Sequence, residues 1–130
     1  MINQFIQRLE TELGDFKRVD HAWDVEPFKD VDAADMPIAL AFVASDSSEE
    51  SNADSCGVKQ RMTRELWVYT VCATDELEDR RAELFDAALG WQAGPEWYPL
   101  QHRRGETRQI RGNYIWWLDV FATWRTIRQP

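Results

Sequence analysis

The chain has 130 residues, of which 44% are hydrophobic and 29% charged, the size and composition of one globular domain with a single core. Its formal net charge is −8, and the acidic excess lies in residues 1–60, which hold 13 acids against 5 bases. This balance argues against a protein whose main task is to grip nucleic-acid phosphates, because such proteins cluster lysine and arginine.

The first predicted element is a short amphipathic helix at the N-terminus. Its apolar residues follow the three-and-four spacing of one helical face: Ile2, Phe5, Ile6, Leu9 and Leu13. Gly14 stands where a left-handed cap would end the helix. Residues 16–19 could then form a strand, and the acidic stretch 27–35 is predicted to be a connection.

Two strands with a polar segment between them are predicted next. Residues 37–45 are apolar on both faces, which is typical of a buried strand, and residues 58–74 are rich in β-branched and aromatic types. The intervening SDSSEESNADSCG (45–57) has almost nothing that could join a core, so it is predicted to be a mobile loop. Together these segments predict a hairpin.

A second helix and a second hairpin are predicted in the C-terminal half. The helix begins near Asp75, is closed by Gly90, and places on one face Leu77, Leu84, Phe85, Ala88 and Leu89. Residues 91–99 form a connection, and residues 100–111 lead through a turn into a strand over 113–128.

That last strand carries large apolar side chains on both faces. Tyr114, Trp116 and Leu118 alternate with Ile115, Trp117 and Phe121. A sheet with helices on one side would leave its other face wet, so the pattern predicts a second covering layer or a neighbouring subunit. The predicted fold class is α+β: a single domain, residues 1–130, with a mixed or mainly antiparallel β-sheet packed against two α-helices.

Little in the sequence supports a catalytic, cofactor or metal site. His21 and Asp24 could form an acid–base pair but lack an accompanying nucleophile, and His102 is interpreted as an exposed polar strand residue. The glycines form no phosphate-binding loop. The spacing of Asp30, Asp32 and Asp35 faintly resembles a calcium loop, but a solvated acidic turn is favoured. We therefore predict no enzyme, no cofactor and no metal.

Cysteine usage and hydropathy suggest a cytosolic, non-membrane protein. Cys72 lies in an apolar run and is predicted to be a small core residue, whereas Cys56 follows the serine-rich segment and is predicted to be exposed. No window approaches the ~20 apolar residues of a membrane span.

Two surface features are candidate interfaces. The first is a basic patch of four arginines around Glu106: Arg103, Arg104, Arg108 and Arg111. It could bind a phosphate backbone or an acidic surface of another subunit, or it could simply be a solvated hairpin. The acidic N-terminal half offers a complement, so identical subunits could join head to tail. The second is the loop with Trp97 and Tyr98, which could also cover a ligand pocket.

The sequence of the last third of the chain resembles that of a known protein family. ALGWQAGPEWYPLQ, followed after a hairpin by GNYIWWLDVFATW, is similar to the tail terminator (tail completion) proteins of long-tailed bacteriophages. The matching residues are Leu89, Gly90, Trp91, Gln92, Gly112, Trp116, Trp117, Asp119, Val120 and Phe121. The likeness covers the whole chain in layout and is specific from about Ala87 onward; the long 45–57 segment and the arginine-rich hairpin depart from it.

The resemblance implies a virion protein, assembled in the host cytoplasm, that forms a hexameric ring on the head-proximal end of the tail tube. Its partners would be itself, the tail tube protein and a head-completion or connector protein, with genomic DNA passing through the lumen unbound. An acidic subunit suits such a channel. The alternatives are a head–tail connector or, from another class, a small α+β enzyme or ligand-binding domain.

Overall fold

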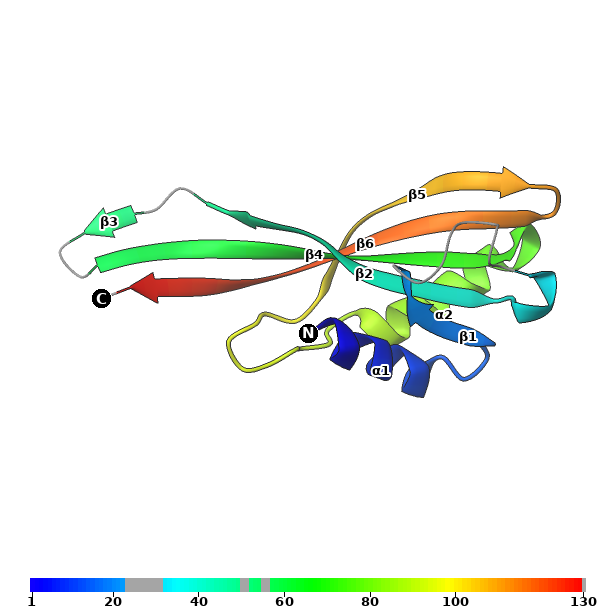
Figure 1. Ribbon diagram of the computed structural model, residues 1–130, viewed down its shortest axis with the longest axis horizontal. Coiled ribbons are helices and arrows are strands. Elements are labelled where there is room, and N and C mark those ends of the chain that lie inside the picture. The colour runs from blue at the N-terminus through cyan, green and yellow to red at the C-terminus, as the bar shows by residue number, and fades with distance from the viewer. Residues whose placement is uncertain (23–31, 50–51, 55–56, 130) are drawn as a thin grey trace.

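One mixed sheet forms the body of the chain in the computed structural model, which describes residues 1–22, 32–49, 52–54 and 57–129 (Figure 1). Its strands are β1 (Arg18–His21), β2 (Ile38–Ser48), β3 (Asn52–Asp54), β4 (Gly57–Ala73), β5 (Gln101–Arg111) and β6 (Tyr114–Gln129). They lie in the order β1-β2-β4-β6-β5, with β3 paired to β4. The β1–β2 pair is parallel and the others are antiparallel. The predicted mixed, mainly antiparallel sheet is confirmed.

Two helices cover one face of this sheet (Figure 1). They are α1 (Ile2–Glu12) and α2 (Leu77–Ala88); two 3-10 turns, η2 (Ala33–Asp35) and η3 (Thr74–Glu76), precede β2 and α2. Arg8 ties the helices together, because its Nε donates to the carbonyl oxygen of Ala87 at 3.1 Å. The predicted α+β fold class is therefore confirmed.

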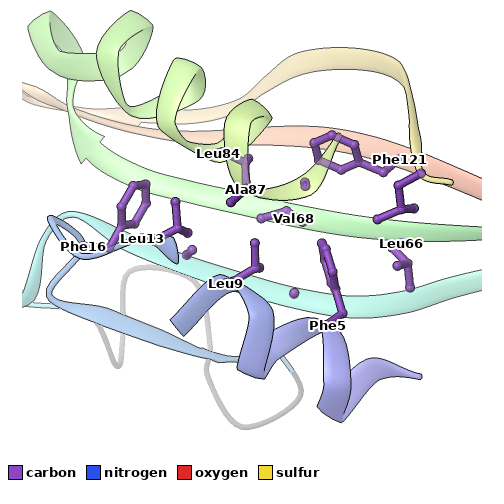
Figure 2. Close-up of a cluster of buried hydrophobic side chains, with 13 residues drawn as sticks. Phe5, Leu9, Leu13, Phe16, Leu66, Val68, Leu84, Ala87 and Phe121 are labelled. Atoms are coloured by element: carbon purple, nitrogen blue, oxygen red, sulfur yellow. The ribbon is translucent and has the colours of Figure 1, made fainter. Parts of the chain in front are cut away.

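The main hydrophobic core lies between the helices and the sheet (Figure 2). The helical spacing places Phe5 and Leu9 of α1 against the sheet, and both are fully buried. Leu84 and Ala87 contribute from α2, and Phe121 from β6. Each large apolar side chain buried in this way stabilises the fold by roughly 1.5–3 kcal/mol.

The longest continuous feature is the pairing of β4 with β6. Their register runs without a shift from Val58↔Gln129 to Ala73↔Tyr114. Gly112, at φ +59°, lies in the two-residue turn that joins β5 to β6, a conformation that favours glycine. One end of the β4–β6 pair lies over the helices, and the other end projects beyond them together with β3 (Figure 1). The sheet thus has a helix-covered half and a projecting ribbon.

Three local predictions are wrong in detail. The predicted loop over 45–57 is largely strand in its described residues, because β2 continues to Ser48 along β4 and β3 follows. Backbone pairing to β4 needs no apolar side chains, so the polar composition of this segment did not reveal the pairing. Gly14 is not left-handed; the C-cap of α1 is Leu13, with φ −94° and ψ 61°. Leu89 leaves the buried face of α2, because the chain turns extended there and leaves the side chain 46% exposed.

Other predictions hold with small shifts. The first strand begins at Arg18 rather than at residue 16, and Phe16 joins the core instead. Gly90, at φ +79°, follows α2 as predicted. The hairpin of β5 and β6 and the connection over 91–99 are confirmed.

Candidate assembly interface

The basic patch lies on β5, which forms one edge of the sheet. This strand is exposed along its length apart from the partly buried His102 and Glu106. Its pairing with β6 shifts register at two places, which leaves Arg103 and Arg108 outside the ladder of paired residues. Such bulges bend an edge strand and re-aim its side chains. The structure thus gathers all four predicted arginines on one open edge.

The four arginines do not all have the same freedom. The guanidinium carbons of Arg104 and Arg108 lie 5.6 and 5.3 Å from the centre of the Trp67 ring. Arg104 also pairs with Glu106, whose Oε1 is 3.9 Å from Nη2 of Arg108. Arg103 is exposed and has no ion pair within the described part of the chain. Two arginines are thus anchored at the sheet surface, while Arg103 remains available to another molecule.

An aromatic layer covers the sheet face opposite the helices. Ring centroids lie 5.7 Å apart for Phe42 and Trp67, and 5.5 Å apart for Tyr69 and Trp116. Beneath these rings Leu118 is fully buried. The two-sided apolar pattern of β6 therefore matches helices on one face and a cluster of aromatic rings on the other, in which Trp116 is only 2% exposed. An open hollow of about 300 Å³ lies between this layer and β5, lined by Tyr69, Arg108, Gln109 and Trp116.

Trp97 and Tyr98, predicted together, occupy different environments. Trp97 is only 7% exposed, with the guanidinium carbons of Arg64 and Arg125 at 5.0 and 4.8 Å from its ring centre. Tyr98 is 54% exposed and stacks on Trp124 at 4.8 Å. The nearby hollow of about 320 Å³ is open and lined by residues of the 92–99 loop itself. Trp97 therefore holds the loop to the ribbon, and Tyr98 offers its ring to the surface.

Arg64 has a second role at the root of the ribbon. Its Nε and Nη2 donate to the two carboxylate oxygens of Asp46 at 2.6 and 2.9 Å. This bidentate hydrogen bond lowers the pKa of Asp46 below its ordinary value, although partial burial opposes the shift. Asp46 therefore stays ionised and fixes the guanidinium that packs on Trp97.

Sequence reasoning missed a buried polar cluster on the helix side of the sheet. Asp119 is fully buried, and its carboxylate accepts two hydrogen bonds from Arg81, at 3.1 and 2.7 Å. Nε2 of His102 lies 2.9 Å from Oδ1 of Asp119. The interpretation of His102 as an exposed polar residue is wrong, because its ring is partly buried and packs 4.8 Å from Phe85. A lone aspartate in the apolar run YIWWLDVFA was the signal, since a buried charge requires partners.

Gly105 makes room for this cluster. A Cβ atom there would lie 2.7 Å from Oδ1 of Asp119, 2.8 Å from Nη2 of Arg81 and 2.9 Å from the Trp117 ring. Those distances are shorter than any carbon contact allows, so the close approach of Arg81 to the sheet requires a glycine in β5. The cluster thereby fastens α2 to both C-terminal strands.

The residues considered for chemistry are dispersed. His21 ends β1, whereas Asp24, Asp30 and Cys56 lie outside the described residues. Asp32 caps η2, accepting from the Ala34 N–H at 3.4 Å, and Asp35 is exposed, as in a solvated turn. Within the described ranges no three His, Cys, Asp or Glu side chains gather as a metal site would require, and no helix is long and apolar enough to cross a membrane.

Cys72 is buried, as predicted. Burial, followed by the nearby Glu76, raises the pKa of its thiol to about 11. The thiol is therefore protonated at neutral pH, and a protonated thiol is a poor nucleophile.

Comparison with known proteins decides the family. The sequence model of the family described as phage tail terminator protein matches residues 2–130. The chain belongs to the phage tail terminator family. Among solved structures, a chain in the "Virion of native gene transfer agent (GTA) particle" aligns over 95% of this chain and 92% of its own length. The TM-score is 0.56 at 14% identity, a likeness of fold alone. No curated protein matches the chain.

Membership in the tail terminator family confirms the resemblance, and the match spans residues 2–130. The protein is a structural component of a phage tail, and the family points to a structural rather than a catalytic role. The assembly surfaces of this tail terminator are therefore of more interest than its hollows.

Proposed function

We propose that this tail terminator caps the head-proximal end of the tail tube as a homo-hexameric ring. The cap stops addition of tube subunits and presents the surface to which the head joins. The family match over residues 2–130 carries this proposal. The proposal takes residues 1–130 to act as one domain, located in the virion after assembly in the host cytoplasm.

Features of the described chain support an assembly role. The open edge strand β5 and the exposed ring of Tyr98 are surfaces that a neighbouring subunit can cover. Arginine and tyrosine are enriched at protein interfaces. We assign interface roles to Tyr98 and to the four arginines of β5, with Trp97 fixing the loop that carries Tyr98.

The proposed partners are the tail tube protein on one side of the ring and a head-completion or connector protein on the other. Genomic DNA passes through the lumen without specific binding. The net charge of −8 supports this passage, because like charge disfavours tight phosphate contacts. If an assembled particle shows the N-terminal acids on the outer wall, this account of the channel fails.

Deletion of the gene tests the proposal. Electron microscopy of the resulting lysate should show headless tails much longer than those of the parent phage, and a plasmid copy of the gene should restore the normal length. Headless tails of normal length would instead assign the protein to a head–tail connector. Infectious particles of normal form would refute both roles.

A further inference from the structure

We propose that β5 of one subunit docks against the β1 side of a second copy of this chain, so that subunits join head to tail through opposite charges. The inference rests on the proposed ring and specifies which surfaces build it. It begins from the sheet order, in which β1 and β5 are the two outermost strands (Figure 1). A ring subunit needs two different contact surfaces on separate sides, and the two edges of one sheet meet that need.

The β5 edge is long, open and basic. Its backbone pairs only with β6 within the described chain, with Arg103 and Arg108 outside the ladder, so the outward peptide groups are left open. Four arginines stand against one glutamate on this strand: Arg103, Arg104, Arg108, Arg111 and Glu106. Because Arg103 lies at a bulge and has no ion pair among the described residues, its charge is directed to a partner.

The opposite side of the sheet is acidic. Among the described residues that flank β1 or lie in it, four are aspartates and two are lysine or arginine: Asp15, Asp20, Asp32 and Asp35, with Lys17 and Arg18. The turn η2 is held beside the start of β1, since Nζ of Lys17 donates to the carbonyl oxygen of Ala34 at 3.3 Å. Asp15 and Asp35 are exposed and have no ion pair in the described structure. This side therefore presents uncompensated negative charge to an incoming β5.

Like charges exclude the simplest alternative. A symmetric contact of β5 with β5 of another copy would bring arginine rows together, and like charges opposite one another destabilise a strand pair. A head-to-tail contact pairs arginine with aspartate instead, and repeated rotation closes such contacts into a ring. Duplex DNA also carries the charge that β5 could bind, but a protein of net charge −8 repels it overall.

A charge-swap experiment tests the pairing. One variant carries Arg103→Glu and Arg104→Glu, and a second carries Asp15→Arg and Asp35→Arg. Each variant alone should weaken self-association on the order of a hundredfold, because juxtaposed like charges cost several kcal/mol. An equimolar mixture should recover assembly, since each reversed surface then meets a complementary one on the other variant. Native mass spectrometry counts the subunits, and circular dichroism checks that each variant is folded.

A matched control is available on the projecting ribbon. Lys59 and Arg128 are exposed and face each other across β4 and β6, in a part of the ribbon that pairs with neither β1 nor β5. Lys59→Glu with Arg128→Glu makes the same change of charge as the β5 variant. It should leave self-association within about twofold of the wild type, because exposed charges outside the contact are screened.

Four results would overturn the inference. Reversed variants that assemble like the wild type would remove both surfaces from the contact. Loss of assembly in both variants without recovery in the mixture would show that the two surfaces do not meet each other. A wild-type chain that stays monomeric at all concentrations would exclude self-association through these edges, while tail length in the deletion strain still tests the capping role separately. If DNA retention on a filter falls in the β5 variant while assembly is unchanged, the arginines belong to a phosphate site instead.

Discussion

Replacing Arg81 by methionine should destabilise the fold severely, because it leaves the Asp119 carboxylate buried without its main partner. Asp119 is fully buried and receives two hydrogen bonds from Arg81, with His102 as its remaining neighbour. Removing one member of a buried ion pair costs roughly 3–5 kcal/mol. For a chain of this size, that loss lowers the melting temperature by about 10–20 °C. Urea unfolding followed by circular dichroism measures the free energy directly, and an unchanged m-value confirms that stability alone has changed.

The neighbouring residue supplies a matched control. Arg80 lies on the same helix, and its ion-pair partners among the described residues are the partly exposed Glu76 and Glu83. Arg80→Met should therefore cost no more than about 1 kcal/mol. Equal losses for Arg80→Met and Arg81→Met would refute the reasoning, because the effect would then come from the helix and not from the buried carboxylate.

A double variant separates charge from packing. Arg81→Met combined with Asp119→Leu removes both partners, so no unpaired charge remains and most of the stability should return. The stacking of Arg81 on Trp117, at 4.6 Å, stays lost and accounts for about 1 kcal/mol of residual deficit. A double variant as unstable as Arg81→Met alone would contradict this account.

Three further predictions follow from burial and protonation. Phe121→Ala should cost roughly 3–5 kcal/mol in urea unfolding, and the half-buried Trp117→Ala distinctly less, because only Phe121 is fully enclosed; equal costs would contradict the burial. The folded-state pKa of Asp46 is lowered, so its contribution is present above the ordinary value of 3.8 and is lost as pH falls through the folded pKa. Since the pair is partly exposed, Asp46→Asn should lower the free energy of unfolding at neutral pH by at most about 1 kcal/mol. Below pH 3.8 the difference between the variant and the wild type should shrink, because the wild type loses the same contribution. A difference at pH 3 as large as that at neutral pH would contradict this prediction. In a Cys56→Ser variant, Cys72 should react with a thiol reagent at pH 8 only after unfolding, because its pKa is about 11 and it is buried; rapid reaction of the native protein would refute this.

Periodic burial made much of the fold predictable. The three-and-four spacing of α1 found Phe5 and Leu9 because a surface helix must bury one stripe. The hairpin of β2 and β4 followed from apolar runs of strand length. Ser45–Ser48 escaped prediction because those residues pair through the backbone with β4, and side-chain composition carries no record of that pairing.

The candidate surfaces were predictable only in part. The arginines of β5 were visible as a run of like charge, but their place on a sheet edge depends on strand order, which long-range pairing sets. Trp97 and Tyr98 are sequence neighbours with opposite exposure, because Arg64 and Arg125 enclose one ring. Contacts between distant segments decided both outcomes, and a local pattern cannot encode them.

The uninterrupted register of β4 and β6 limits how this chain can change length. Register shifts occur in β2 and β5, where they pair with the two central strands, whereas β4 and β6 match residue for residue. A single insertion in either central strand would turn every side chain beyond it to the opposite face. In the core, such an insertion would move helix-facing side chains to the aromatic face and the reverse. It would also displace the projecting ribbon. Insertions and deletions should therefore be tolerated in the turns that flank these two strands and be lethal within them.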